Sequence, residues 1–137
     1  MKIVVGYDGS DAATRALRRG ADFAFHGAQL RVVTAARVAA LVRDPAMGTS
    51  PVDPAERGAR AKTLAEARSL IADLGVEASF VAGTGDPADV LLQDAEETGA
   101  DLIIVGTRGK NVAQRLVLGS VSAKIVHHAP CDVLIVR

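Results

Sequence analysis

The sequence predicts an α/β fold in which an open parallel sheet carries helices on both faces. Five short apolar runs are rich in β-branched residues, which is typical of strands buried on both faces of a parallel sheet. Four segments between them repeat apolar residues at helical spacing. A strand–helix alternation repeated four times and closed by a fifth strand favours an open sheet with right-handed crossovers.

Each element follows from a local pattern. The expected strands are residues 3–7, 30–36, 76–82, 102–105 and 133–136. The expected helices place apolar residues at i, i+3, i+4 and i+7. Their faces consist of Ala13, Ala16, Leu17, Ala21 and Ala24; of Leu64, Ala67, Ile71 and Leu74; of Ala88, Leu91, Leu92 and Ala95; and of Leu118, Val121, Ser122 and Ile125.

Start and stop signals bound three of these helices. The start signals are capping side chains or a proline at the first helical position, and the stop signals are glycines or a following proline. They are Ser10 and Asp11 with Gly27 for the first helix, Asp86-Pro87 with Gly99 for the third, and His127-His128 before Ala129-Pro130 for the last.

Residues 37–58 do not fit this alternation. They contain Pro45, Pro51 and Pro54 and show no sustained period, so we expect a long excursion after the second strand. Loops longer than about 12–15 residues are usually functional or mobile, and the sequence leaves the role of this one open.

Composition excludes several classes of function. A chain of 137 residues has the length of a single domain, residues 1–137. Sixteen basic residues balance sixteen acidic ones, and 3% aromatic residues supply few stacking platforms, so we expect no nucleic acid partner. The only cysteine, Cys131, excludes an internal disulfide and is expected to pack as an inert thiol. With no signal-peptide run and no run of the roughly 20 apolar residues that span a bilayer, we expect a cytoplasmic protein that does not contact a membrane.

A glycine-rich stretch near the C-terminus contains the candidate ligand-binding residues. Gly106 and Gly109 follow the fourth strand, and Gly119-Ser120 opens the last helix after nine further residues. Glycines let a backbone turn sharply and approach a ligand, and a helix N-terminus favours an anion. The carboxyl ends of central strands are where open α/β sheets bind ligands, so this stretch indicates a phosphate site.

Three basic residues in the same loop, Arg108, Lys110 and Arg115, add positive charge, although a solvated surface explains them equally well. The lysine-containing P-loop and the Gly-x-Gly-x-x-Gly dinucleotide fingerprint are both absent.

These motifs resemble the universal stress protein family over nearly the whole chain. Gly106-x-x-Gly109, nine residues and Gly119-Ser120 are similar to its ATP-binding signature. The other matching segments are residues 8–10, 85–88, 100–106, 118–122 and 128–136. The family often has proline where this chain has Asp132, a departure at the entry to the last strand that leaves the glycine motif intact.

The resemblance implies an adenine nucleotide alpha hydrolase-like fold with strand order 3-2-1-4-5 and ATP between strands one and four. It also implies a homodimer in which the last strands pair. Carried over by position, the resemblance implies that backbone groups of Asp8 and Ala35 contact the adenine and that Val105 and Gly106 flank the nucleoside. It also implies that the ribose and phosphates are held by Gly109, Gly119, Ser120 and Val121, with Mg²⁺ on the phosphate oxygens.

Several alternatives stay open beside this hypothesis of a nucleotide-binding protein in stress response and signalling. The pocket could prefer AMP or cyclic AMP, or the chain could be a dimeric interaction module that needs no nucleotide. No dedicated catalytic base is evident, so an enzyme would be at most a slow ATPase, with Asp8 touching a metal or water. Locally, Gly106 and Gly109 could form only a turn, Asp8 could only stabilise a turn, and Ser120 could be only a helix cap.

Overall fold

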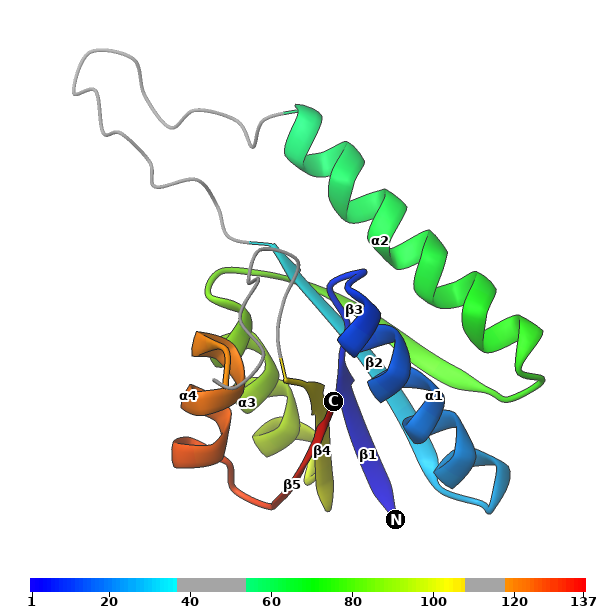
Figure 1. Cartoon of the computed structure of the whole chain (residues 1–137), viewed down its shortest axis with the longest axis vertical. Coiled ribbons are helices and arrows are strands. Elements are labelled where there is room, and N and C mark those ends of the chain that lie inside the picture. Colours follow the sequence, from blue (N-terminus) through cyan, green and yellow to red (C-terminus); the bar gives the residue numbers. More distant parts are fainter. Residues whose placement is uncertain (37–53, 108–117) are drawn as a thin grey trace.

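The computed structural model describes residues 1–36, 54–107 and 118–137, which form an open α/β sheet (Figure 1). All strand pairs are parallel, and the order is β3-β2-β1-β4-β5. The strands are β1 (Lys2–Gly6), β2 (Gln29–Ala36), β3 (Ala78–Thr84), β4 (Leu102–Gly106) and β5 (Asp132–Val136). The predicted fold class and strand order are therefore confirmed.

Within the described ranges, four helices cover the two faces of the sheet. They are α1 (Asp11–Phe25), α2 (Pro54–Asp73), α3 (Pro87–Thr98) and α4 (Ser120–His128). One core cluster joins α1 and α2 to the sheet, and a second joins α3 and α4 to its opposite face. The strand–helix alternation thus produces the three layers that the sequence predicts.

The central strand β1 supplies both cores. Ile3 and Val5 belong to the cluster under α1 and α2, whereas Val4 belongs to the cluster under α3 and α4. All three side chains are at most 1% exposed. Because successive side chains of a strand point to opposite faces, a strand covered on both sides reads as an unbroken apolar run.

The excursion after β2 is shorter than predicted. The helix α2 begins at Pro54, so residues 54–58 are helical, while residues 37–53 lie outside the described residues. Residues 57–59 are exposed. A turn of helix that faces solvent carries no apolar period, so the pattern could not reveal it. The bounds of β3 also lie two residues later than predicted, since its pairing with β2 extends to Thr84.

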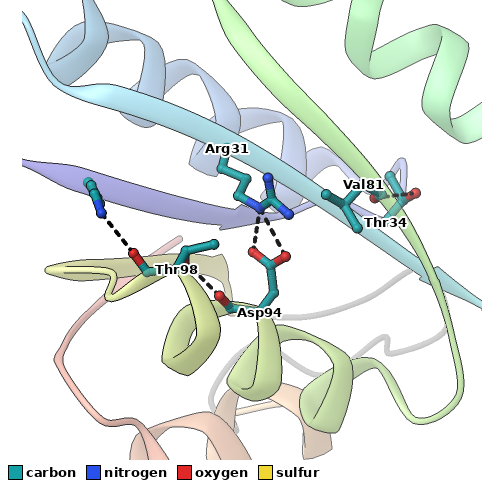
Figure 2. Close-up of polar contacts among 6 residues, drawn as sticks. Arg31, Thr34, Val81, Asp94 and Thr98 are labelled. Carbon is teal, nitrogen blue, oxygen red and sulfur yellow. Dashed lines mark hydrogen bonds and ion pairs between the residues drawn. The ribbon is translucent and has the colours of Figure 1, made fainter.

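A half-buried ion pair fixes α3 against β2 (Figure 2). The Nε atom of Arg31 lies 2.9 and 2.8 Å from the two carboxylate oxygens of Asp94, whose residue is only 7% exposed. The hydrogen bond to Asp94 raises the pKa of Arg31, so the guanidinium stays charged. The hydroxyl of Thr98 donates to the backbone oxygen of Asp94 at 2.6 Å, in the last turn of α3. These contacts lie toward the amino ends of the strands.

Candidate functional site

The sheet has one topological switch point, between β1 and β4. From β1 the chain winds outward through β2 to β3, and then returns to β4 on the other side of β1 before reaching β5. The two central strands are paired in register, with Val5 opposite Ile104. Their carboxyl ends, at Gly6 and Gly106, therefore lie at the same edge, where ligands bind in open α/β sheets.

The glycine at the end of β4 is required by packing. A Cβ atom on Gly106 would lie 2.6 Å from the backbone carbon of Ala12 and 2.8 Å from the backbone nitrogen of Ala13. No flexible side chain can move aside to relieve such a contact, because the clashing atoms belong to the backbone of the first turn of α1. The close approach at Gly106 therefore brings β4 and the start of α1 together at the switch point.

Thr107 joins three elements at this edge. Its backbone N–H donates to Val136 of β5 at 2.8 Å, and its carbonyl accepts from the N–H of Gly119 at 2.8 Å. The hydroxyl of Ser122, in the first turn of α4, lies 3.3 Å from the same carbonyl. The start of α4 is thus hydrogen-bonded to the residue that follows β4, so Gly119 lies close to the end of the strand that Gly106 closes.

Helices α1 and α3 begin with side-chain caps. The hydroxyl of Ser10 accepts from the N–H of Ala13 at 3.1 Å. A carboxylate oxygen of Asp86 accepts from the N–H groups of Ala88 and Asp89 at 3.1 and 3.2 Å. Both caps were predicted from the sequence, and each satisfies amides that a helix leaves without partners.

The start of α4 is different. Its N-cap is Gly119, in an extended conformation with φ −62°, and no side chain in the described part of the chain caps the helix. Ser120 does not serve as the cap, because it is the first residue inside the helix. Its side chain is exposed. The first amides of α4 therefore have no side-chain cap from the described residues, and they lie at the positive end of the helix dipole.

The predicted site residues in the described chain lie at or next to this edge. Asp8 is exposed after β1, and one of its carboxylate oxygens accepts from the N–H of Ser10 at 2.9 Å, a turn contact. Ala35 is half-buried in β2, opposite Gly83 of β3. The other described members are Val105, which is 4% exposed, Gly106, Gly119, Ser120 and the half-buried Val121. Gly109, Arg108, Lys110 and Arg115 lie outside the described residues.

An ion-pair cluster beside the site was not predicted. The ammonium of Lys124 on α4 lies 2.6 Å from a carboxylate oxygen of Asp89 and 3.3 Å from one of Asp86. The hydrogen bond to Asp89 is the main cause that raises the pKa of Lys124. Burial favours the protonated form of Asp86, but hydrogen bonds from the Asp89 N–H and from Lys124 outweigh it and lower the pKa. The cluster ties the uncapped helix to its capped neighbour.

Other features of the described residues do not add a site at this edge. Two hollows of about 710 and 370 Å³ are lined by residues near the amino ends of the strands, such as Gln29 and Ser79. Burial raises the pKa of the Cys131 thiol, which makes it a poor nucleophile. Among the described residues there is no group of three or more His, Cys, Asp or Glu that could hold a metal ion. None of the helices in the described ranges combines the length and hydrophobicity needed to span a bilayer.

Comparison with known proteins agrees with this architecture. A family model of the universal stress proteins matches residues 1–137. A universal stress protein of Thermus aquaticus is 39% identical over 137 residues, which cover 98% of this chain and 97% of the relative. A solved universal stress protein in complex with cAMP is 31% identical, with a TM-score of 0.73 over 100% of this chain and 96% of its own. The universal stress protein from Archaeoglobus fulgidus in complex with dAMP is 27% identical, with a TM-score of 0.73 over 100% and 98% of the two chains.

The strand order and the switch point define the class first: an open α/β protein with the adenine nucleotide alpha hydrolase-like fold. Within that class, the chain belongs to the universal stress protein family.

Proposed function

We propose that the chain binds ATP at the carboxyl ends of β1 and β4 and acts as a nucleotide-binding protein in stress response and signalling. The start of α4 carries this proposal, because it presents amide donors without a side-chain cap from the described residues. A helix N-terminus of this kind favours phosphate. The related proteins in complex with cAMP and dAMP support an adenine nucleotide as the ligand.

In the proposed complex the nucleotide lies across the switch point. Backbone groups of Asp8 and Ala35 contact the adenine, and Val105 and Gly106 flank the nucleoside. Gly119, Ser120 and Val121, together with Gly109, hold the ribose and phosphates. The backbone supplies most of these contacts, so the site depends on glycines and on a helix end more than on charged side chains.

In the proposal, Mg²⁺ binds this site only together with the nucleotide. Magnesium sites with substrate phosphates typically use one or two carboxylates and several waters. Asp8 is the exposed carboxylate that follows β1, and it already accepts a hydrogen bond from the N–H of Ser10. The phosphate oxygens therefore hold the ion in the proposal, and no step of chemistry is assigned to it.

Calorimetric titration of the purified chain tests the proposal. ATP with Mg²⁺ is expected to bind at one site per chain, and competition with AMP and cyclic AMP ranks the three nucleotides. Tighter binding of cyclic AMP would favour the second candidate, which the cAMP complex of a related protein supports. Absence of binding at millimolar nucleotide and Mg²⁺ would overturn the proposal.

The proposal extends to a homodimer through β5, which lies at one edge of the sheet. Val133, Leu134, Ile135 and Val136 are all half-buried, and this run contains neither a charge nor a proline. Proteins usually protect an edge of this kind with charges, prolines or a covering segment, and pairing with a second copy protects it equally well.

Sedimentation at several protein concentrations tests the dimer and is expected to give twice the mass of the chain. A monomer at every concentration would overturn it. A dimer that binds no nucleotide would instead favour the interaction-module alternative. The cytoplasmic location stays a prediction from the sequence.

A further inference from the structure

A buried hydroxyl lies directly behind the uncapped start of α4. Ser122 is 2% exposed, whereas Ser120, two residues earlier, is exposed. The hydroxyl of Ser122 lies 3.0 Å from the carbonyl oxygen of Gly119 and 3.3 Å from that of Thr107. Its single proton is therefore shared between two carbonyls that belong to different segments of the site.

These contacts hold the two peptide units that meet at Gly119. The N–H of Gly119 donates to the carbonyl of Thr107 at 2.8 Å, and the carbonyl of Gly119 accepts from the N–H of Ala123 at 2.9 Å as well as from Ser122. Thr107 is itself fixed, because its N–H donates to Val136 of β5 at 2.8 Å. The hydroxyl of Ser122 thus completes a closed set of hydrogen bonds from the sheet to the first turn of α4.

The orientation of the Gly119 carbonyl also determines how the amides that follow it are oriented. In the peptide plane, the direction of the Ser120 N–H is set by the carbonyl of Gly119, which Ser122 holds. Ser122 points away from solvent and makes its contacts to backbone carbonyls, so it acts on a ligand only through the helix start. Gly119, the N-cap, adds no side-chain hydrogen bond of its own to this restraint.

We infer that Ser122 is a positioning residue that aims the amides of Ser120 and Val121 at the phosphates of the nucleotide. The inference rests on the proposed function. It deepens that function by assigning to Ser122 the preference of the site for a phosphorylated ligand over the bare nucleoside. The adenine and nucleoside contacts assigned to β1, β2 and β4 do not depend on the hydroxyl.

A comparison of two ligands separates positioning from general stability. In Ser122→Ala, ATP affinity is expected to fall about threefold to tenfold, the usual net effect of one hydrogen bond, while adenosine affinity stays within about twofold of the original protein. The matched control is Thr98→Val, which removes a helical hydroxyl that donates to a backbone carbonyl at the amino end of the sheet. This control is expected to leave both affinities within about twofold.

Two results would overturn the inference: an ATP affinity of Ser122→Ala equal to that of the original chain, or an equal loss for ATP and adenosine. Amide hydrogen exchange of the ligand-free proteins gives a second readout. The Gly119 and Ala123 amides are expected to exchange about threefold to tenfold faster in Ser122→Ala, with the change confined to the start of α4.

If the original chain binds no nucleotide, the proposed function fails, and the exchange comparison still decides whether Ser122 orders the helix start. Unchanged exchange at Gly119 and Ala123 overturns the inference in that case too.

Discussion

Helices α3 and α4 both begin at the carboxyl edge of the sheet and pack against the same face, but their first turns differ (Figure 1). Asp86 accepts two hydrogen bonds from the first turn of α3. Gly119 offers the start of α4 no side-chain acceptor. A capping side chain contributes about 0.5–2 kcal/mol relative to alanine, and changing the cap to glycine costs only a few tenths.

Within this pair of helices, the start of α3 contributes to stability, whereas the start of α4 is proposed to bind the ligand. The start of α3 is already satisfied by its own side chain, and so is that of α1 through Ser10. The start of α4 has no such cap among the described residues, and it lies at the edge where the sheet topology favours a ligand. In the proposed function, this helix start holds the phosphates in place of a capping side chain.

The largest expected effect comes from breaking the contact that brings the capped start of α1 to the switch point. Gly106→Ala places a methyl group 2.6 Å from the backbone of Ala12. Overpacking of this kind costs about 1–3 kcal/mol of unfolding free energy, and we expect the upper end because backbone atoms must move. Urea unfolding measures the loss.

The matched control is Gly58→Ala in α2, where an added Cβ meets nothing within 4 Å. It is expected to raise the unfolding free energy by up to about 1 kcal/mol, because alanine is the better helix former. Equal stabilities for Gly106→Ala and the original chain would show that α1 can move away from β4 without cost.

The second effect comes from giving α4 the cap that α3 has. In Gly119→Asp the new carboxylate accepts from the first amides and repels phosphate, so ATP affinity is expected to fall by at least about tenfold. The unfolding free energy is expected to rise by roughly 0.5 kcal/mol, since the helix end is now satisfied. Calorimetry and urea unfolding measure the two quantities on the same protein.

Gly119→Asn is the matched control, because it caps without adding charge. Its ATP affinity is expected to lie between those of the original chain and of Gly119→Asp. If Gly119→Asp binds ATP as tightly as the original chain, the phosphates do not use this helix end.

The order of strands and helices was predictable because each buried strand reads as an apolar run and each helix carries an apolar stripe. Caps such as Ser10 and Asp86 were predictable because they stand just before those stripes. The start of α2 at Pro54 was not, since the exposed residues 57–59 carry no apolar period. The amphipathic pattern reports only the surface that a helix buries.

The glycine motif predicted where α4 begins, and the structure refines it by making Gly119 the cap and Ser120 the first helical residue. The partners of Ser122 and Lys124 were not predictable. Ser122 contacts a carbonyl 15 residues earlier, and Lys124 contacts Asp86, 38 residues earlier. Contacts across that much sequence depend on how elements pack, which local spacing does not encode.

The smallest expected effect comes from removing the cap of α3. In Asp86→Ala the unfolding free energy is expected to fall by about 1 kcal/mol, and ATP affinity is expected to stay within about twofold, because the start of α3 does not hold the phosphates. Lys124 keeps its contact of 2.6 Å with Asp89, so α4 remains tied to α3. A large loss of ATP affinity would show that the two helix starts do not act separately.

The pH dependence of this variant sharpens the comparison. Burial opposes ionisation of Asp86, but hydrogen bonds from the Asp89 N–H and Lys124 lower its pKa below the ordinary value of 3.8. A carboxyl group with a lowered pKa in the folded state stabilises the protein above its unfolded pKa, and that contribution is lost as the pH falls through the folded pKa. The stability gap between the original chain and Asp86→Ala is therefore expected to narrow from about pH 6 to about pH 3. The difference in unfolding free energy between the original chain and Gly119→Asn is expected to stay constant over the same pH range, because neither residue ionises. If the difference for Asp86→Ala also stays constant, the carboxylate charge contributes nothing to the cap.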